Sequence, residues 1–305
     1  MQDLSSAKVL VTGGTGFVGR HLRRRLRQLG CPIVLLARRA EATDTAEQWV
    51  VGDLTDAAFV SRTLSTITPD VIFHLASTRE RSVTAEAFRH TVVTNLPLAI
   101  NVFAAASSLP GLTSLVTLGT AEEYGSGSLP FTEPQREAPV SAYSLSKLCI
   151  THLAQIMNRA HGLPAVVLRA GILYGPGQPD DMLVAQLFAA ARSGEPLPMT
   201  LGEQTRDFLF VEDAVDALLQ AAMTPAARGE VINVGSGREM RLMDLVRLIE
   251  KITGRREIAK LGAKPYRPYE IMRYALDQRK ALQVLGWEAR TSLDEGMKHT
   301  WREIG

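Results

Sequence analysis

The sequence contains little cysteine, no long apolar run and almost no net charge, and each absence excludes a class of protein. Cys31 and Cys149 are the only cysteines among 305 residues, too few for a disulfide framework and without the spacing of metal ligands. No apolar run approaches the roughly 18 residues of a membrane span, and the first residues, MQDLSSAK, lack an apolar signal core. A formal net charge of +2 gives no reason to expect a nucleic acid or an anionic membrane as partner. We therefore expect a soluble, cytoplasmic protein without a metal site.

What the chain does contain is a large apolar fraction in alternating strand-like and helical segments. Hydrophobic residues make up 46% of the sequence, enough for one or two closely joined domains. Strands are expected at 9–12, 33–37, 49–51, 71–75, 115–118 and 165–168. Helices are expected at 16–29, 57–66, 85–106, 141–161 and 182–193. The alternation predicts an α/β fold, a doubly wound parallel sheet of Rossmann type with helices on both faces.

The first strand runs through a glycine cluster into an amphipathic helix. Gly14, Gly16 and Gly19 match the spacing G-x-G-x-x-G, and Gly13, Gly16 and Gly19 equally match G-x-x-G-x-x-G. Such glycines allow a tight turn and a close approach of the backbone to a pyrophosphate, which the first amides of the helix then face. The cluster predicts a dinucleotide site. Five arginines crowd the same helix, and we expect them on its solvated face: Arg20, Arg23, Arg24, Arg25 and Arg27.

A change in composition after residue 170 predicts a second unit. Residues 174–179 are rich in Pro and Gly, and beyond the next helical pattern the expected strands are short and the loops long. Ligands of open α/β sheets bind at the carboxyl ends of the strands. We therefore expect residues 1–170 to form the dinucleotide-binding domain and residues 171–305 mainly a substrate-binding lobe, with segments that return to the sheet.

Three chemistry-bearing features follow the glycine cluster in order. The fifth strand ends in GTAEEYG at 119–125, which places a hydroxyl and two carboxylates at the edge where ligands bind. Tyr143 and Lys147 lie four residues apart on an expected helix, so their side chains share a face and the ammonium can lower the phenol pKa. Arg169 and the sequence YGP at 174–176 follow the sixth strand.

In this order and at this approximate spacing, the motifs resemble those of the extended short-chain dehydrogenase/reductase superfamily, in its nucleotide-sugar epimerase, dehydratase and reductase branch. The resemblance covers nearly the whole chain. It rests on TGGTGFVG at 12–19, GDL at 52–54, FHLA at 73–76, Asn95, Thr120, Tyr143 with Lys147, YGP at 174–176, RDFLFVED at 206–213, NVGSG at 233–237 and LGW at 285–287.

The resemblance implies a role for each matching residue. Tyr143 would be the general acid/base, Lys147 its pKa partner and a ribose ligand, and Thr120 a contact of the reacting oxygen. Arg206 and Arg267 would hold the diphosphate of a nucleotide-sugar, a task that suits a bidentate guanidinium, although each could equally be a surface ion pair. The nicotinamide cofactor would be bound by Tyr143 and Lys147 together with Gly13, Gly16, Phe17, Val18, Gly19, Asp53, Leu54, His74, Leu75 and Ala76.

Two of these cofactor residues have simpler explanations. Asp53 would serve equally as a turn or helix-cap residue, and His74 is expected to pack between strand and loop rather than to act as an acid.

At the end of the second strand the sequence departs from the NAD-using members of this family. Where they carry an acidic residue for the ribose 2′-hydroxyl, this chain has Ala37, followed by Arg38 and Arg39. A missing carboxylate and two cations favour a 2′-phosphate. We therefore expect NADP(H), with NAD(H) as the alternative if both arginines merely face water.

Two more departures concern the substrate. The 4,6-dehydratases of the family place Asp-Glu or Ser-Glu directly after the threonine, whereas here Ala121 precedes Glu122, so the acid that would help to expel water is missing. Glu122 could still act as a base, bind a sugar hydroxyl or face solvent. Many members carry Asn where this chain has Ile172, which indicates an altered substrate pocket.

Together these features predict an enzyme that reduces a nucleotide-activated 4-keto-6-deoxy sugar with NADPH, Tyr143 protonating the emerging alkoxide. The alternatives are a nucleotide-sugar 4-epimerase or, less in keeping with Ala121, a 4,6-dehydratase, either with tightly bound NAD. A ketone or aldehyde reductase without a nucleotide handle is a further alternative. A non-catalytic NADP-binding protein is disfavoured because the Tyr143/Lys147 pair is present. The resemblance also implies a homodimer formed through the helices at 85–106 and 141–161.

Overall fold

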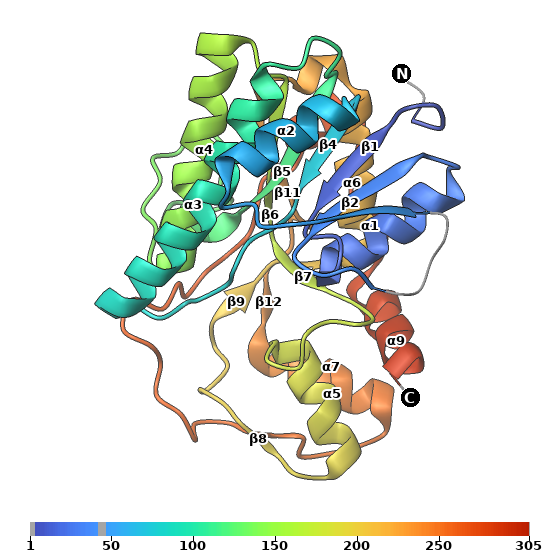
Figure 1. Ribbon diagram of the computed structural model, residues 1–305. Coiled ribbons are helices and arrows are strands. Elements are labelled where there is room, and N and C mark those ends of the chain that lie inside the picture. Colours follow the sequence, from blue (N-terminus) through green and yellow to red (C-terminus); the bar gives the residue numbers. More distant parts are fainter. Residues whose placement is uncertain (1–3, 42–46, 305) are drawn as a thin grey trace.

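A seven-stranded parallel sheet forms the centre of the molecule, as the computed structural model of residues 4–41 and 47–304 shows (Figure 1). Its strands lie in the order β11-β6-β5-β4-β1-β2-β3. Their bounds are β1 (Val9–Thr12), β2 (Ile33–Ala37), β3 (Glu47–Val51), β4 (Val71–His74), β5 (Ser114–Thr120), β6 (Ala165–Ala170) and β11 (Val231–Val234). This sheet and the helices on both its faces confirm the predicted doubly wound Rossmann fold.

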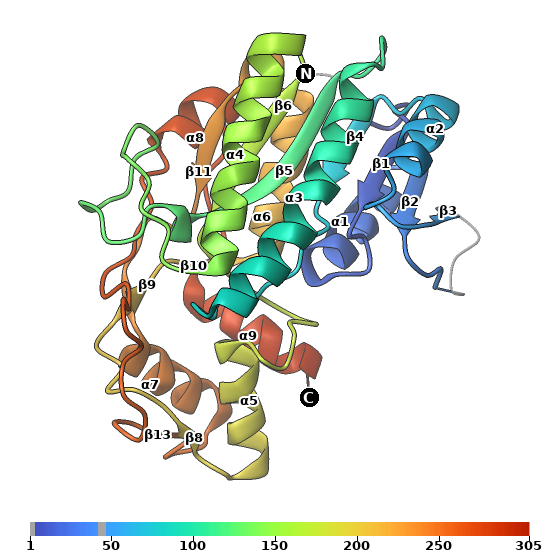
Figure 2. The same cartoon turned by 60° about the vertical axis from the view of Figure 1, so that its left-hand side comes forward.

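The strands are apolar throughout because both faces of the sheet are covered. Successive side chains of a strand point to opposite faces, so Val9 and Val11 of β1 pack into one core and Leu10 into the other. The first face is covered by α1 (Phe17–Gln28), α6 (Val211–Met223) and α8 (Arg279–Leu285). The second is covered by α2 (Ala57–Ile67), α3 (Ala85–Ser107) and α4 (Ala142–His161), of which α3 and α4 lie side by side (Figure 2).

All helices and strands expected before residue 194 form, and the differences are at their ends. β5 and β6 extend two residues beyond the predicted ends, because Gly119 and Thr120 continue the parallel pairing with Arg169 and Ala170. These extensions fall at the carboxyl edge of the sheet. Thr120 is therefore held by strand pairing and not by a loop.

A smaller lobe lies beyond this edge, in the lower part of Figure 1. It contains α5 (Leu183–Ser193), α7 (Leu242–Thr253) and α9 (Leu293–Ile304), which bury Phe188, Leu245 and Met297 in a core of their own. Short strands connect it: β7 (Ile172–Tyr174) with β10 (Phe208–Phe210), β9 (Thr205–Arg206) with β12 (Met240–Arg241), and β8 (Leu197–Pro198) with β13 (Ala259–Lys260). Two 3-10 turns, η1 (Ala121–Glu123) and η2 (Pro225–Ala227), complete the elements.

The expectation that all the arginines of α1 are solvated is wrong for Arg23. Its side chain is buried, its guanidinium pairs with Glu47 (2.6 Å) and Glu41 (2.9 Å), and it stacks on the ring of Trp49 at 5.0 Å. This side of α1 faces the β2–β3 edge of the sheet, where β3 supplies both a carboxylate and an aromatic ring. Arg23 therefore ties helix to sheet.

Two structural absences hold for the described residues. Within them no helix combines the length and apolar character needed to cross a membrane. The same residues contain no group of three or more His, Cys, Asp or Glu side chains placed to hold a metal ion.

Candidate active site

The glycine cluster forms the turn between β1 and α1. Gly13 has a φ of 72°, and a Cβ on it would lie 2.6 Å from the Ala76 nitrogen; a Cβ on Gly19 would lie 2.2 Å from the Gly13 oxygen. Gly14 is different, because its added Cβ would meet the side chain of Leu35 at 2.8 Å. The structure therefore assigns Gly14 to packing. The spacing that serves the turn and the helix start is that of Gly13, Gly16 and Gly19.

A cleft opens where the strand order reverses, between the loops that follow β1 and β4. Its volume is about 350 Å³, within the range of small-molecule sites. Nine of the predicted residues line it: Gly13, Gly16, Phe17, Val18, Gly19, Leu75, Thr120, Tyr143 and Lys147. A side chain on Gly13 would collide with the backbone of Leu75 and Ala76, so only glycine lets the turn pack against the β4 loop. The exposed backbone at Gly16, where α1 begins, fits the approach of a dinucleotide pyrophosphate.

Two further residues predicted to bind the cofactor, Ala76 and Leu54, are not among those that line the cleft. Ala76 is half-buried, and its N–H donates to the hydroxyl of Thr12 at 3.4 Å. Leu54 packs its side chain into the core under α2 and α3, and its carbonyl accepts a hydrogen bond from Asn101. The Leu54 side chain therefore serves the fold.

The residues predicted to select the cofactor lie farther out, where β2 and β3 end. Arg38 and Arg39 are exposed directly after β2, next to half-buried Ala37. Asp53 accepts a hydrogen bond from the Thr55 N–H at 2.9 Å; this bond, with Arg38 nearby, lowers the pKa of its carboxyl. Asp53 is therefore a turn residue, and its carboxylate is stabilised by the nearby charge of Arg38.

The first turn of α4 positions Tyr143. Ser141 caps the helix, and the N–H of Tyr143 donates to the carbonyl of Glu80 at 3.0 Å. One turn later, Lys147 donates from Nζ to the carbonyl of Leu118 at 2.8 Å, and Nζ lies 5.8 Å from the centroid of the Tyr143 ring. Tyr143, Lys147 and Thr120 all line the cleft.

The prediction that Lys147 lowers the phenol pKa is not met in this structure. Burial raises the pKa of Tyr143 to about 12, with Glu122 adding to the increase and Arg81 opposing it. Burial lowers the pKa of the Lys147 ammonium to about 8, which nearby Glu123 partly offsets. Desolvation outweighs the attraction between charges at both sites. At neutral pH the phenol is protonated, the form that reduction of a carbonyl requires.

The two carboxylates after Thr120 have different roles. Glu123 is completely buried, and it accepts from the Thr120 N–H, the Thr151 hydroxyl and Arg169. The expectation that it faces a ligand is therefore wrong. Glu122 lines a second cavity and pairs with Arg81 at 2.8 Å.

Arg169 also proves to be structural. Its side chain is 1% exposed, it pairs with Glu123 and Glu137, each at 2.8 Å, and its guanidinium lies 4.6 Å from the centroid of the Tyr124 ring. A buried arginine needs such partners because its charge cannot be neutralised by deprotonation. Arg169 therefore links β6 to the residues that follow β5. The sequence YGP at 174–176 is also structural, because its Tyr174 is buried in the core of the lobe.

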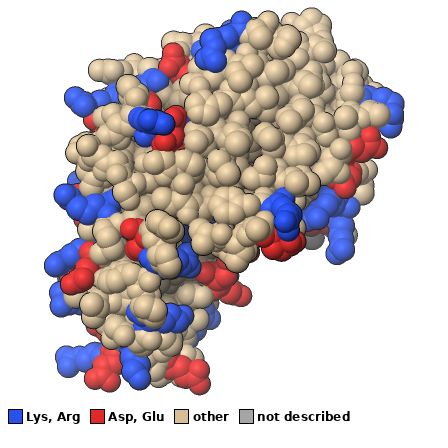
Figure 3. Space-filling model, turned by 90° about the vertical axis from the view of Figure 1, so that its left-hand side faces the viewer, with Lys and Arg blue, Asp and Glu red and all other residues tan. Residues whose placement is uncertain are grey.

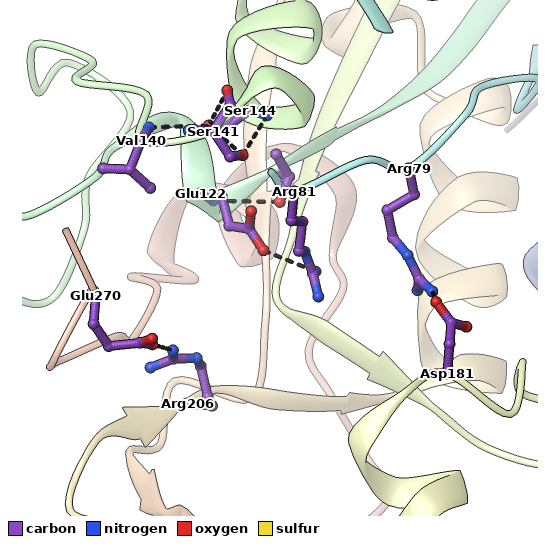
Figure 4. A network of polar contacts seen from close by, with 10 residues as sticks. Arg79, Arg81, Glu122, Val140, Ser141, Ser144, Asp181, Arg206 and Glu270 are labelled. Atoms are coloured by element: carbon purple, nitrogen blue, oxygen red, sulfur yellow. Dashed lines mark hydrogen bonds and ion pairs between the residues drawn. The ribbon is translucent and has the colours of Figure 1, made fainter. Parts of the chain in front are cut away.

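The second cavity, of about 480 Å³, lies between the sheet edge and the lobe. It brings together the three residues predicted to bind substrate, Glu122, Arg206 and Arg267. Arg206 pairs with Glu270 (Figure 4). It also donates to the carbonyls of Thr205 and Ile271. Its guanidinium is thereby fixed at the wall of the cavity.

Ile172, the residue that departs from the family pattern, lies where the cavities meet. It lines the cofactor cleft, the cavity with Glu122 and an adjoining cavity toward α5. An apolar side chain at this junction gives a bound ligand no hydrogen bond. The adjoining cavity also contains Arg206 and Arg267.

Sequence reasoning missed the loop between β4 and α3. Arg79 and Arg81 both line the cofactor cleft; Arg79 pairs with Asp181 across its mouth, and Arg81 pairs with Glu122 (Figure 4). Tyr274, from the segment before α8, also lines the cavity with Glu122. The available signal for the arginines was topological, because β4 neighbours β1 at the point where the strand order reverses.

His74 packs in the core. Its Nδ1 lies 2.9 Å from the Thr12 hydroxyl, its ring meets Phe103 edge-on, and burial, with the charge of Lys147, lowers its pKa to about 3. It is neutral at physiological pH, so it offers no acid function there.

The chain is similar to known proteins over nearly its whole length. The model of the NAD dependent epimerase/dehydratase family matches residues 9–235. A dTDP-6-deoxy-L-talose 4-dehydrogenase (NAD(P)+) of Kitasatospora kifunensis is 33% identical over 97% of this chain and 95% of its own. A UDP-glucuronic acid 4-epimerase of Bacillus cereus, solved with UDP-glucuronic acid and NAD, has 26% identity and a TM-score of 0.89 over 97% of this chain and 98% of its own.

A third relative is longer than this protein. The trifunctional UDP-glucose 4,6-dehydratase, UDP-4-keto-6-deoxy-D-glucose 3,5-epimerase and UDP-4-keto-L-rhamnose reductase of Arabidopsis thaliana is 29% identical over 96% of this chain. The chain spans 46% of that relative's length.

Proposed function

The chain belongs to the NAD dependent epimerase/dehydratase family, and from this premise we propose that it reduces a nucleotide-activated 4-keto-6-deoxy sugar with NADPH. It is an NAD(P)-dependent enzyme of the extended short-chain dehydrogenase/reductase type, whose relatives modify nucleotide sugars. The keto-sugar substrate, the direction of the reaction and the choice of cofactor are proposed.

The charge at the end of β2 carries the proposal. Arg38 and Arg39 follow Ala37 there, and no carboxylate occupies the position of Ala37. Two cations suit a 2′-phosphate, which distinguishes NADPH from NADH. A cofactor consumed in net reduction must be exchanged after each turnover, whereas an enzyme that recycles its cofactor can retain NAD.

The groups around Tyr143 suit proton delivery to a carbonyl oxygen. The nicotinamide, when bound, supplies the hydride to the keto carbon. Tyr143 donates its proton to the oxygen that becomes an alkoxide, and the hydroxyl of Thr120, which lines the same cleft, can hydrogen-bond to that oxygen. Lys147, held by the Leu118 carbonyl, keeps a positive charge next to the phenol.

The other reactions of the family find less support at the sheet edge. Dehydration needs an acid for the departing water, and Ala121 stands where such an acid would be. The remaining carboxylate, Glu122, is engaged by Arg81.

We propose that the substrate is recognised in the second cavity, which adjoins the cofactor cleft at Ile172. Arg206 and Arg267 line the cavity beside Glu122, and two guanidinium groups fit a diphosphate. The Kitasatospora relative is named for a dTDP-6-deoxy sugar, and the Bacillus structure contains a UDP-sugar. These names support a nucleotide-diphosphate sugar as substrate.

Transfer of deuterium tests the proposed reaction. The protein is incubated with (4S)-deuterated NADPH or NADH and with dTDP- and UDP-linked 4-keto-6-deoxyglucose, and products are identified by mass spectrometry. We expect a product that carries one deuterium on the carbinol carbon, formed faster with NADPH. The double variant Ala37→Asp/Arg38→Ser should reverse the cofactor preference, while Arg228→Ser, an exposed arginine near η2, should leave it unchanged. Absence of label from the product would refute net reduction.

A 4-epimerase is the second candidate, because a solved relative with that activity contains NAD. It would use the same Tyr143 and Thr120. An epimerase would convert a 4-hydroxy nucleotide-sugar without consuming added NADPH and without gaining label from it.

We also propose that two copies of the chain associate through α3 and α4. Apolar side chains are exposed on both helices: Val93 is 68% and Ile100 42% exposed on α3, and Ile156 is 52% exposed on α4. Figure 3 shows this side of the molecule, with few charged side chains across its centre. Sedimentation of the wild-type protein should give a dimer, and Ile100→Glu with Ile156→Glu should give a monomer.

A further inference from the structure

Arg81 occupies the junction between the cofactor cleft and the substrate cavity. Its side chain lines both, and it also lines the adjoining cavity toward α5. Its backbone is held against the start of α4, because the carbonyls of Glu80 and Ser82 accept hydrogen bonds from the N–H groups of Tyr143 and Ala142. Arg81 thus lies between the two residues, Glu80 and Ser82, whose carbonyls hold the first turn of α4.

The guanidinium of Arg81 engages Glu122. Figure 4 shows the two side chains pointing toward one another. The Nη2 atom lies 2.8 Å from Glu122 Oε1, and the side chains are 36% and 12% exposed. The Glu122 N–H in turn donates to the hydroxyl of Thr120 at 3.3 Å. The backbone of Glu122 is therefore tied to Thr120, the residue proposed to contact the reacting oxygen.

Arg81 keeps a donor for a ligand. Its Nε is buried and has no hydrogen-bond partner in the described part of the chain, and the same is true of the nearby Tyr274 hydroxyl. Both side chains line the cavity that contains Glu122. Buried donors without partners are rare in native proteins, so an acceptor brought by a ligand would complete them.

A carboxylate beside a bound ketone has a second possible reaction. Hydrogens on the carbons that flank a carbonyl are acidic, and Glu122 lies next to the oxygen-binding Thr120. If Glu122 took such a proton, the C–H electron pair would form a C=C bond and the carbonyl pair would move to oxygen, giving an enolate. Return of a proton from water would exchange or invert that carbon before reduction.

We propose that Arg81 is a positioning residue that prevents this side reaction by holding Glu122 in an ion pair. The inference rests on the proposed function, since it requires a keto sugar in the groove. Arg81 thereby determines reaction specificity: the sugar is reduced at the carbonyl without loss of hydrogen from the neighbouring carbons.

Hydrogen exchange in D₂O tests the proposal without hydride transfer. The holoprotein with NADP⁺ is mixed with dTDP- or UDP-4-keto-6-deoxyglucose, and deuterium on the carbons flanking the carbonyl is followed by NMR and mass spectrometry. Arg81→Gln should raise the exchange rate by about 10²-fold, the size of a typical general-base effect. Arg81→Lys, which restores the charge, should remain close to wild type. Arg81→Gln/Glu122→Gln should lose the added exchange, because the base is gone.

Two results would overturn this inference and leave the proposed function intact. Exchange in Arg81→Gln that equals wild type would show that Arg81 does not restrain Glu122. Increased exchange that persists in the double variant would show that another group is the base. Both readings require that the variants keep the wild-type circular dichroism and bind the keto sugar. A wild-type protein that neither binds nor reduces the keto sugar would refute the proposed function and this inference with it.

Discussion

Single residues in this protein take their roles from burial and partners more than from residue type. Glu122 and Glu123 are neighbours in sequence, yet Glu123 is completely buried against Arg169 and Glu122 lines a cavity. The sequence shows two equivalent carboxylates because neither their partners nor their burial is local: Arg169 comes from β6, and Arg81 from the loop after β4.

Tyr143→Phe removes the proposed proton donor and little else. Turnover with a keto sugar should fall by about 10²- to 10⁴-fold, as expected for loss of a general acid. NADPH binding, measured by fluorescence titration, should change little because the ring remains in place. Tyr266→Phe, which removes a hydroxyl bonded to Glu203, is the matched control and should keep wild-type turnover. Normal turnover in Tyr143→Phe would remove the phenol from the mechanism.

His74 makes the fold sensitive to acid. Burial lowers its pKa from 6.5 to about 3, so between these values the unfolded chain binds a proton that the native state does not. Stability should therefore fall as pH decreases through this range, by up to about 1.4 kcal/mol per pH unit from this residue.

His74→Gln should reduce that slope, measured as the free energy of unfolding in urea between about pH 5 and about pH 6.5. His90→Gln, which changes an exposed histidine of α3, should leave the slope nearly unchanged. Equal slopes in all three proteins would show that His74 gains a proton in the native state.

At the scale of the element, the turn between β1 and α1 depends on glycine for two separate reasons. Gly13 combines a φ of 72° with a Cβ position 2.6 Å from the backbone of the β4 loop. Gly13→Ala should therefore weaken NADPH binding and destabilise the fold by more than the roughly 1–2 kcal/mol of a left-handed conformation alone.

Gly194→Ala separates these two effects. Gly194 ends α5 with a φ of 76°, and nothing lies within 4 Å of its Cβ position, so this variant should lose stability but retain cofactor affinity. Calorimetry and cofactor titration of both variants make the comparison. Unchanged NADPH affinity in Gly13→Ala would contradict the close approach of this turn to the cofactor.

The attachment of α1 to the sheet edge depends on Arg23. Arg23→Ala removes the guanidinium that pairs with the completely buried carboxylate of Glu47 at 2.6 Å and leaves the more distant Arg27 at 4.0 Å, and we expect a loss of about 3–5 kcal/mol in the free energy of unfolding. Arg25 lies on the same helix as Arg23, is half-exposed, and has its Nε 3.9 Å from Asp216 of α6. Arg25→Ala should lower the free energy of unfolding by about 0–1 kcal/mol. Similar losses in urea denaturation of the two variants would contradict the structural role of Arg23.

Elements with strong periodicity could be predicted from the sequence, and the short ones could not. The strand 33–37 is observed at its predicted bounds because four of its five apolar residues are buried between two helical layers and the fifth, Ala37, is half-buried. β9 and β12 contain two residues each, and their pairing of Arg206 with Met240 joins distant segments, which no local pattern encodes. Arg81 lies in a loop without a repeating hydrophobic pattern. Its position between the cavities therefore follows only from the fact that β1 and β4 are adjacent in the sheet.

At the scale of the molecule, the sheet supplies the proposed cofactor cleft and the lobe supplies the far wall of the proposed substrate cavity. Thr120 and Tyr143 come from β5 and α4, whereas Arg206 and Arg267 come from β9 and the segment after β13. A substrate that reaches from Tyr143 to these arginines must contact both parts, which suits a sugar joined to a nucleotide diphosphate.

The central claim, net reduction with an exchangeable NADPH, is tested most directly by identifying the cofactor that the purified protein carries. The protein is denatured, the released nicotinamide species are measured by mass spectrometry, and the native protein is titrated with NADPH and NADH. We expect little bound cofactor and clearly tighter binding of NADPH. Stoichiometric NAD in the purified protein would contradict the claim and identify an enzyme that recycles its cofactor within each turnover.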